Sequence, residues 1–301
     1  MLNNLGLSGN MLPGPHFTSG PSILPRFPTI TAAIFHHVFT IPDQTAAIDH
    51  SSPEPRTVTY AELGSRAVHL AKFLRSVDVR PGDRVPFVAR RGIDMLVGIV
   101  AILSCGAQYV PMDGKVVPRE TLRRVVEQSG SNVVLCLEET AHRVTELEME
   151  KCMPVVVEEH SVDLEPISYR SHYEEHLAGL TTEDSGCYVI YTSGTTGKPK
   201  GVDVTHGNVA NLVCSEPGSL GITQGVRVGH VLSISFDMAA WEVLGCLANG
   251  GTLVMRGSDW ARTISEIDVL ICTPSILSRY SPEQFPNLRT VATAGEPISP
   301  K

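Results

Sequence analysis

The hydrophobic positions of this chain alternate between short β-branched runs and longer segments of helical length. Apolar runs at Arg84–Ala89, Tyr109–Met112 and Asn132–Leu137 predict buried strands, because strands covered on both faces read as continuous apolar stretches. Segments at Ile93–Ser104 and Glu120–Ser129 predict the helices between them. Strands and helices in alternation predict a mainly parallel sheet covered by helices.

The alternation returns in the second half of the chain, where we expect a second α/β layer after the first. The charged stretch Glu138–Thr182 predicts a variable surface excursion between the two halves. The fold class is therefore α/β, with layered, helix-covered, mainly parallel sheets. The predicted elements of the second half are strands at Cys187–Tyr191, Gly229–Ser235, Thr252–Met255, Asp268–Cys272 and Thr290–Thr293, and helices at Gly207–Cys214 and Met238–Ala248.

The first residues do not share this pattern. Residues 1–27 mix Gly, Pro, Ser and Asn without strand or helix periodicity, which predicts a tail or a linker. The fold is expected to begin near Pro28. We therefore divide the chain into residues 1–27 and one folded part at residues 28–301.

Composition argues against several classes of function. The formal net charge of −8 leaves no basic excess for a phosphate backbone, so nucleic acid is not an expected partner. No apolar run reaches membrane-spanning length and no signal peptide is recognised, so we expect no membrane anchor. The seven cysteines are scattered without a C-x-x-C pair, which favours a reducing, cytoplasmic setting and predicts no metal ligands in this chain.

The candidate chemistry lies in Tyr191-Thr-Ser-Gly-Thr-Thr-Gly-Lys-Pro-Lys-Gly201, directly after a predicted strand. Glycines let backbone N–H groups approach an anion, hydroxyls donate hydrogen bonds and lysines supply charge, so this loop is suited to phosphate. It is not the G-x-x-x-x-G-K-[ST] loop, because the chain has Thr192 and Pro199 where that pattern needs Gly and Ser or Thr. By composition alone, an exposed Ser/Gly-rich turn is the simpler interpretation.

The ordered string resembles the signature loop of the adenylate-forming superfamily, which includes acyl-CoA synthetases, luciferases and adenylation domains of nonribosomal peptide synthetases. Three further stretches follow that family's order, namely Val58–Leu63, Ala101–Asp113 and Ser235–Glu242. The last resembles the motif that opens the amino-acid pocket of peptide synthetases. Over residues 28–301 the chain is similar to such an adenylation domain, which implies the N-terminal core of the adenylate-forming fold, incomplete at its C-terminus.

The resemblance implies that ATP is a cofactor and that the loop holds its triphosphate. In the implied reaction a carboxylate oxygen attacks the α-phosphorus of ATP and pyrophosphate leaves, so the protein has to align two anions. Lys200 and Thr196 take the catalytic role, and Lys198 has an equally weighted alternative as a solvated surface side chain. The implied ATP contacts are Thr192, Ser193, Gly194, Thr195, Thr196, Gly197, Lys198 and Lys200.

Asp237 lies where a predicted strand gives way to a helix, which is where ligands meet open α/β sheets. From position alone, a helix cap is its simpler role. The resemblance implies a buried acid that pairs with the α-ammonium of an amino-acid substrate, because an ammonium held away from water needs a partner. The implied pocket predicts a medium or large apolar side chain, although its apolar members also fit an ordinary core; they are Met238, Trp241, Ile271, Ala292 and Ala294.

The sequence stops at Lys301, before the family's later motifs and its small C-terminal domain. The resemblance implies Mg²⁺ as a further cofactor whose carboxylate ligand lies beyond this chain. It also implies a carrier-protein phosphopantetheine as partner of the full-length enzyme. We expect a fragment, a truncation of the gene model, or a pseudoenzyme derived from a multidomain synthetase, unable to turn over alone.

Two other functions fit the sequence. An acyl- or aryl-CoA ligase shares the phosphate-binding loop but has no substrate ammonium that needs Asp237. The second alternative is a non-catalytic fragment that only binds a nucleotide or a partner protein. The amino acid itself is not readable, since one methylene contributes only about 1–3 kcal/mol of discrimination.

Overall fold

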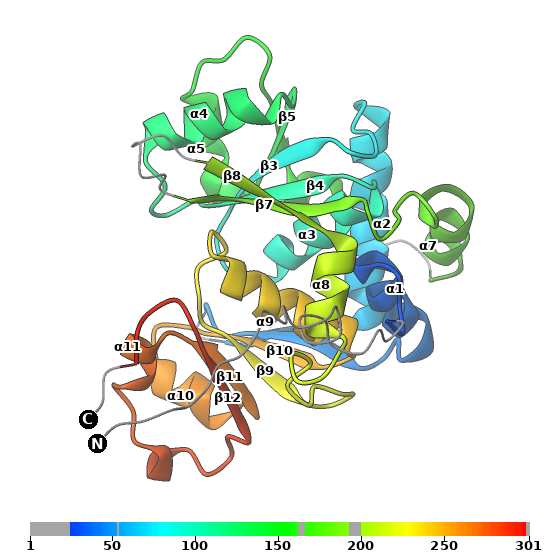
Figure 1. The fold of residues 1–301 in the computed structure, drawn as a ribbon. Coiled ribbons are helices and arrows are strands. Elements are labelled where there is room, and N and C mark those ends of the chain that lie inside the picture. The colour runs from blue at the N-terminus through cyan, green and yellow to red at the C-terminus, as the bar shows by residue number, and fades with distance from the viewer. Residues whose placement is uncertain (1–24, 53, 162–165, 193–199, 299–301) are drawn as a thin grey trace, which may run out of the picture.

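The computed structural model describes residues 25–52, 54–161, 166–192 and 200–298. In this part of the chain, two six-stranded sheets lie one above the other, with helices between and around them (Figure 1). The upper sheet has the strand order β6-β5-β3-β4-β7-β8 and the lower sheet β12-β11-β9-β10-β1-β2. The predicted α/β class with mainly parallel sheets is confirmed.

The upper sheet is parallel except for its last strand. β4 pairs with β3 along six residues, from Arg84↔Gln108 to Ala89↔Asp113, so both strands end at the same edge. β7 and β8 form an antiparallel hairpin at the other side of β4. The strands are β3 (Arg84–Ala89), β4 (Gln108–Asp113), β5 (Val133–Cys136), β6 (Met153–Val156), β7 (Gly186–Thr192) and β8 (Lys200–Thr205).

The lower sheet combines strands from distant parts of the chain. β1 inserts in parallel beside β10 and pairs antiparallel with β2, so an early segment completes a sheet formed mainly by later ones. Ala46 and Ala47 of β1 are fully buried there. The strands are β1 (Thr45–Asp49), β2 (Arg56–Thr59), β9 (Arg227–His230), β10 (Thr252–Met255), β11 (Val269–Cys272) and β12 (Thr290–Thr293).

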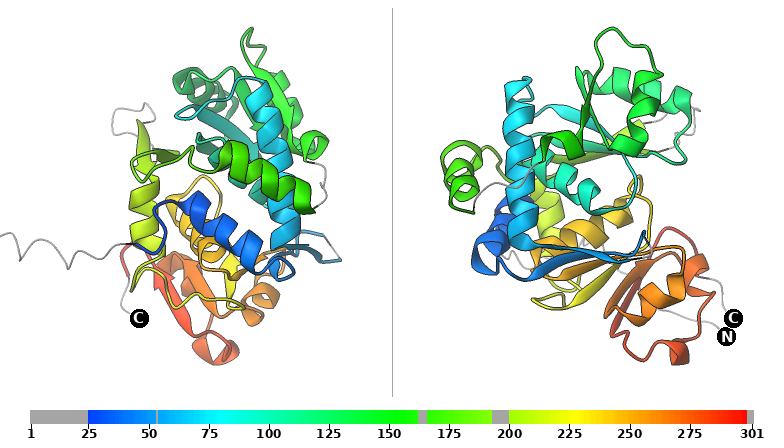
Figure 2. Two further views of the ribbon diagram at one scale, coloured as in Figure 1. Left: turned by 90° about the vertical axis from the view of Figure 1, so that its right-hand side faces the viewer. Right: turned by 180° about the vertical axis from the view of Figure 1, so that it is seen from behind.

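Helices fill the space between the two sheets and cover their outer sides, and the longest, α2, runs alongside both (Figure 2). On the upper sheet, α4 packs Leu122, Val125 and Val126 against the strands. The longer helices are α1 (Ile30–Thr40), α2 (Tyr60–Ser76), α3 (Ile93–Ser104), α4 (Arg119–Ser129), α8 (His206–Val213) and α9 (Asp237–Ala248). The shorter ones are α5 (Ala141–Thr145), α6 (Val157–His160), α7 (Pro166–His172), α10 (Trp260–Ser265) and α11 (Pro274–Leu277).

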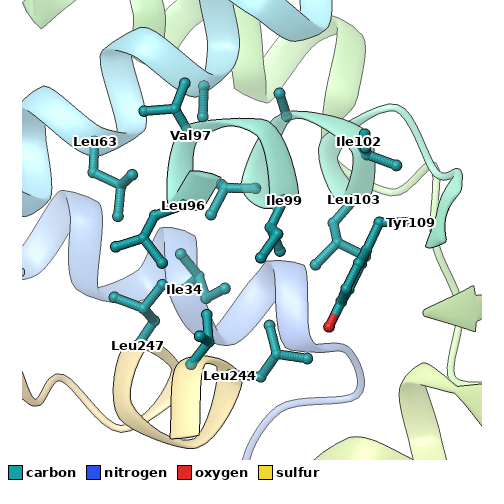
Figure 3. Close-up of a cluster of buried hydrophobic side chains, with 14 of the residues drawn as sticks. Ile34, Leu63, Leu96, Val97, Ile99, Ile102, Leu103, Tyr109, Leu244 and Leu247 are labelled. Atoms are coloured by element: carbon teal, nitrogen blue, oxygen red, sulfur yellow. The ribbon is translucent and has the colours of Figure 1, made fainter. Parts of the chain in front are cut away.

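The main core surrounds α3, whose side chains are nearly all buried (Figure 3). A helix that is apolar on every face is one that is packed on every face. Leu96 of α3 lies against Ile34 of α1 and Leu247 of α9, so this helix joins the layers. Gly98 permits close packing on β3, because a Cβ there would come within 2.4 Å of the Phe87 ring.

All predicted strands and helices but one agree with the structure to within one residue. The predicted strand Gly229–Ser235 is wrong beyond His230, where β9 ends. The backbone groups that follow bond to side chains instead of a neighbouring strand. The guanidinium of Arg91 donates to the carbonyls of residues 231 and 232, and Glu242 accepts from both N–H groups.

Two further expectations about the layers are wrong. The strand predicted at Cys187–Tyr191 belongs to the upper sheet and not to a second layer, since β7 pairs with β4. The stretch Glu138–Thr182 does not lie only on the surface, because it supplies edge strand β6 and the Tyr173 ring, which stacks on Phe35 of α1 at 3.7 Å. The division at residues 27 and 28 stays a prediction.

Candidate functional site

The predicted phosphate-binding loop joins β7 to β8 at the turn end of their hairpin. Thr192 ends β7 and pairs with Lys200, which begins β8, and 3.5 Å separates Thr192 Oγ1 from Lys200 O. Both side chains are exposed, so a hydroxyl and an ammonium stand open to a ligand at this end. The other predicted loop contacts lie outside the described residues and stay predictions: Ser193, Gly194, Thr195, Thr196, Gly197 and Lys198.

Close packing holds the hairpin in position. Gly201 lies against β7 so tightly that a Cβ there would come within 2.9 Å of Val189 Cγ1. At the other end of β8, the imidazole of His206 is fully buried, and its Nδ1 accepts from the N–H of Ile30 at 3.3 Å. Burial lowers the pKa of His206 to about 4, so the ring is neutral near pH 7. The hairpin therefore has a buried, closely packed base and an exposed polar end.

Asp237 is the first residue of α9, and its side chain is exposed. The expectation of a buried acid is therefore wrong. A carboxylate in the first turn stays at the helix end, where the N-terminal dipole stabilises it, and Asp237 Oδ1 accepts from the N–H of Met238 at 2.8 Å. Among the described residues Asp237 has no ion-pair partner within 4.0 Å.

Asp237 and Trp241 line the same cavity of about 190 Å³, between α9, α8 and the hairpin. The indole N–H of Trp241 donates to the carbonyl of Gly218 at 2.8 Å, which fixes the ring in the wall. Tyr188 of β7 also lines this cavity. Burial raises the pKa of Tyr188, and the nearby Asp237 carboxylate adds to that shift, so its hydroxyl stays protonated.

The cavity lies close to the strand that leads into the phosphate-binding loop. Tyr188 and Thr192 are both on β7, and a strand rises about 3.3 Å per residue, so the cavity wall at Tyr188 and the strand end at Thr192 are roughly 13 Å apart. Side chains four residues apart point to the same face of a strand, so Tyr188 in the cavity wall and the exposed Thr192 share one face of β7.

The other predicted pocket residues do not line this cavity. Ile271 is fully buried in the main core and pairs with Ala292 across β11 and β12. Met238 is half-buried and packs on the same core, whereas Ala294 is exposed. Ile271 is therefore an ordinary core residue, which was the alternative to a place in the pocket. The assignment of Met238, Ile271, Ala292 and Ala294 to a substrate pocket stays a prediction.

Hydrogen bonds tie two of the predicted motifs together. The backbone N–H of Asp113, at the end of β4, donates to Ser235 Oγ at 2.9 Å. The hydroxyl of Ser233 donates to Asp113 Oδ2 at 2.7 Å. The segment that leads into α9 is therefore attached to the carboxyl edge of the upper sheet, which fixes Asp237 relative to the hairpin.

Behind this segment lies a buried ionic cluster that the sequence did not reveal. Glu242 accepts from the N–H of Val231 at 3.0 Å and lies 2.7 Å from His230 Nδ1, with both side chains almost fully buried. Arg256 Nε donates to the carbonyl of Val231 at 3.0 Å, and Arg91 donates to the same carbonyl at 3.0 Å. Burial raises the pKa of Glu242, whereas its backbone donors and the two guanidiniums oppose that shift. The only signal in the sequence was an acid inside the apolar segment of α9.

The described residues differ in how well they fit the two expected cofactors. Thr192 and Lys200 supply the hydroxyl and ammonium donors that a phosphate chain needs. Within the described ranges, no group of three or more His, Cys, Asp or Glu side chains is arranged to hold a metal ion. The described residues therefore do not form a Mg²⁺ site. None of the described helices combines the length and apolar character needed to cross a membrane.

Comparison with known sequences identifies relatives of this chain. A family model described as AMP-binding enzyme matches residues 34–301. Adenylate-forming reductase 03009 of Coprinopsis cinerea is 44% identical over 87% of this chain, and tyrocidine synthase 2 of Brevibacillus parabrevis is 33% identical over 86%. The chain spans 25% of the reductase and 7% of the synthase, so it corresponds to one part of each.

Solved structures give the same result for the fold. The α-methyl-L-serine-AMP-bound form of the nonribosomal peptide synthetase FmoA3 matches with a TM-score of 0.78 and 25% identity, over 92% of this chain and 31% of that one. A fatty acyl-adenylate ligase from L. pneumophila, 19% identical, matches with a TM-score of 0.76 over 91% of this chain and 50% of its own length. The second likeness concerns the fold alone.

Proposed function

The chain belongs to the AMP-binding enzyme family, and from this premise we propose that it supplies the ATP- and acid-binding part of an enzyme that forms acyl-adenylates. The observation that carries the proposal is the hairpin, whose exposed Thr192 and Lys200 flank a loop rich in glycine, hydroxyls and lysine. Convergent N–H, hydroxyl and ammonium donors stabilise the negative charge of a phosphate chain.

The residues of the chain act on the two reacting anions. In adenylation, an oxygen of the substrate carboxylate forms a bond to the α-phosphorus of ATP, and the bond from that phosphorus to the pyrophosphate oxygen breaks. Lys200 offsets the charge of the phosphates, and Thr192 orients them through its hydroxyl. The pairing of β7 with β8 keeps both groups next to each other at the end of the hairpin.

We propose an amino acid as the acid that is activated. Support comes from Asp237, whose carboxylate lines a cavity next to the hairpin and has no ion-pair partner among the described residues. A substrate ammonium would neutralise it there, and the protonated Tyr188 hydroxyl and the Trp241 ring would form the cavity walls. Because Asp237 is exposed, we expect a moderate preference of about 5–10-fold, or roughly 1–1.4 kcal/mol.

A second candidate concerns what happens to the adenylate. Identities of 44% and 39% to two adenylate-forming reductases of Coprinopsis cinerea exceed the 33% identity to tyrocidine synthase 2. This difference supports adenylate formation as one part of a reductase. In a peptide synthetase, the partner would instead be a carrier-protein phosphopantetheine. Seven free cysteines support a reducing, cytoplasmic location for either protein.

Calorimetric titration with two matched acyl-adenylate analogues tests the choice of acid. One analogue is phenylalanyl sulfamoyl adenosine, and the other is its desamino counterpart, 3-phenylpropanoyl sulfamoyl adenosine. The wild-type chain is expected to bind the first about 5–10-fold more tightly, and Asp237→Asn to bind both equally. Glu283→Gln, at an exposed acid outside this cavity, is the matched control and is expected to keep the preference.

Each result has a distinct meaning. Equal binding of both analogues by the wild type, with ATP also bound, would contradict the amino-acid proposal and favour an acyl or aryl substrate. Absence of binding by ATP and both analogues would contradict nucleotide binding itself. Amino-acid-dependent exchange of pyrophosphate into ATP by residues 1–301 would contradict the expectation that this chain cannot turn over alone.

A further inference from the structure

A separate cavity of about 330 Å³ lies where strands of the upper and lower sheets end together. Its walls include Ala89 and Asp113 at the carboxyl ends of β3 and β4, and His230 at the carboxyl end of β9. This size is at the lower end of the range of small-molecule sites, and the carboxyl edge of parallel strands is where ligands meet α/β sheets.

The walls of this cavity are rich in positive charge. Arg90, Arg91, Lys115 and Arg256 all line it, against the single acid Asp113. Of the four, only Arg90 forms an ion pair among the described residues, with Glu139 at 2.6 Å. Three cationic side chains therefore share one cavity without a carboxylate partner of their own.

The acids near the cavity are already engaged elsewhere. Asp113 accepts from the Ser233 hydroxyl at 2.7 Å and from the N–H of Lys115 at 2.9 Å. Glu242, behind the wall, accepts backbone N–H groups and contacts His230 rather than either guanidinium. Asp49 pairs with Arg56 at 2.9 Å. These three carboxylates partly offset the positive charge of Arg91 at longer range, and the first two also offset that of Arg256. None of them forms a direct contact with either guanidinium.

The two guanidiniums use their hydrogen bonds on neutral groups. Arg91 donates to the carbonyls of residues 231 and 232, and Arg256 to those of residues 231 and 257. Within the described residues, Arg91 Nε and His230 Nε2 are buried and have no hydrogen-bond partner. Burial and the charge of Arg256 lower the pKa of Arg91 to about 10, so the two cations repel each other. Arg256 also lies over the Trp260 ring, 4.1 Å from its centroid, and the acids compensate these partly buried charges only at longer range. A bound anion would therefore relieve the remaining cost of keeping them away from water.

We propose that this cavity, between the ends of β3, β4 and β9, is a binding site for a phosphate-class oxyanion held by Arg91, Arg256 and Lys115. Guanidinium groups present a planar fork that matches the oxygens of phosphate, and Lys115 adds an exposed charge at the cavity. The hydroxyls of Ser51 and Ser258 in the lining add donors of the kind that phosphate oxygens accept. None of the lining residues of this cavity belongs to the hairpin, so the two sites are distinct.

Titration of the 301-residue chain with inorganic phosphate, pyrophosphate and methyl phosphate, at constant ionic strength, tests the proposal. Lys115→Gln and Arg256→Gln are each expected to raise the Kd about 5–10-fold, because each removes one charge that contacts the anion. Arg256→Lys keeps the charge but loses the fork, so an intermediate Kd is expected. Lys151→Gln, an exposed lysine outside the cavity, is the matched control with an unchanged Kd.

The hairpin offers the rival location for these anions, so Lys200→Ala is titrated in parallel. Binding lost in Lys200→Ala and retained in Lys115→Gln and Arg256→Gln would overturn the proposal, as would no binding by any of the three anions. Lys115 is exposed, so its variant tests the site even if Arg256→Gln unfolds. Methyl phosphate bound as tightly as phosphate identifies the end of a phosphate ester as the ligand, whereas binding of only the inorganic anions identifies a free ion.

Discussion

The β7–β8 hairpin and the ionic cluster around Glu242 are assembled in opposite ways. The hairpin takes its chemistry from one continuous string, and Thr192 and Lys200 at its end are exposed. The cluster collects charged groups from β9, α9 and the segments after β3 and β10, and its acid is fully buried. We therefore expect changes at the hairpin end to affect ligand binding, and changes at Glu242, the buried acid of the cluster, to affect stability.

The largest effect is expected for Glu242→Leu. This change leaves two backbone N–H groups, His230 and the nearby guanidiniums without their acid, so the free energy of unfolding should fall by about 3–5 kcal/mol. Urea unfolding followed by circular dichroism measures it. Glu283→Leu, at an exposed acid, is the control and should stay within about 0.5 kcal/mol of the wild type. A loss below about 1 kcal/mol in Glu242→Leu would show that this buried acid contributes little to the stability of the chain.

The base of the hairpin should make stability depend on pH. The pKa of His206 is lowered by burial to about 4 in the folded chain and rises to its ordinary value of 6.5 on unfolding. The unfolded chain then binds more protons between these values, so stability is fully present above pH 6.5 and falls by up to about 3 kcal/mol as the pH falls toward 4.

Urea unfolding between pH 7.5 and 4.5 checks this dependence. His206→Asn is expected to give a shallower loss with falling pH than the wild type. Part of the slope should remain, because the pKa values of His37 and His230 are also lowered by burial. An unchanged slope in the variant would mean that His206 is not the buried neutral group at the hairpin base.

At the other end of the hairpin, Lys200→Ala is expected to weaken ATP binding about 10–100-fold, since a charged hydrogen bond to phosphate contributes roughly 1.5–3 kcal/mol. Its unfolding free energy should stay within about 0.5 kcal/mol of the wild type, because the side chain is exposed. Calorimetry with ATP and urea unfolding measure the two quantities. Lys151→Ala, also exposed, should change neither; an equal loss of stability and affinity in Lys200→Ala would erase the contrast between the regions.

The smallest effect is expected where the hairpin meets α8. Thr205 Oγ1 accepts from the N–H of Asn208 at 3.2 Å, and Asn208 Oδ1 accepts from the N–H of Thr205 at 3.3 Å. Thr205→Ala should lower the free energy of unfolding by about 1 kcal/mol and leave the ATP affinity unchanged. A tenfold loss of affinity would mean that the start of α8 positions the loop.

The difference between one continuous string and groups collected from distant segments also explains what the sequence could predict. Continuous patterns predicted the strands and helices well, because periodicity is a local property, as in Ile93–Ser104. The insertion of β1 beside β10 and the pairing of β7 with β4 depend on contacts across the chain, which no local pattern contains. For the same reason the Arg91, His230 and Arg256 cluster was missed, and β9 was predicted too long. The motif around Asp237 could be recognised in the sequence, and its resemblance implied a buried acid. The exposure of Asp237 instead follows from its place as the first residue of α9.

If the proposed function is right, one ligand reaches both the hairpin end and the cavity beside α9. A crystal structure of the 301-residue chain with phenylalanyl sulfamoyl adenosine tests it most directly. We expect the α-ammonium within about 4 Å of the Asp237 carboxylate and the sulfamoyl group on the side of Lys200 and Thr192. A ligand bound elsewhere, or bound with its ammonium in solvent and Asp237 uninvolved, would contradict the account.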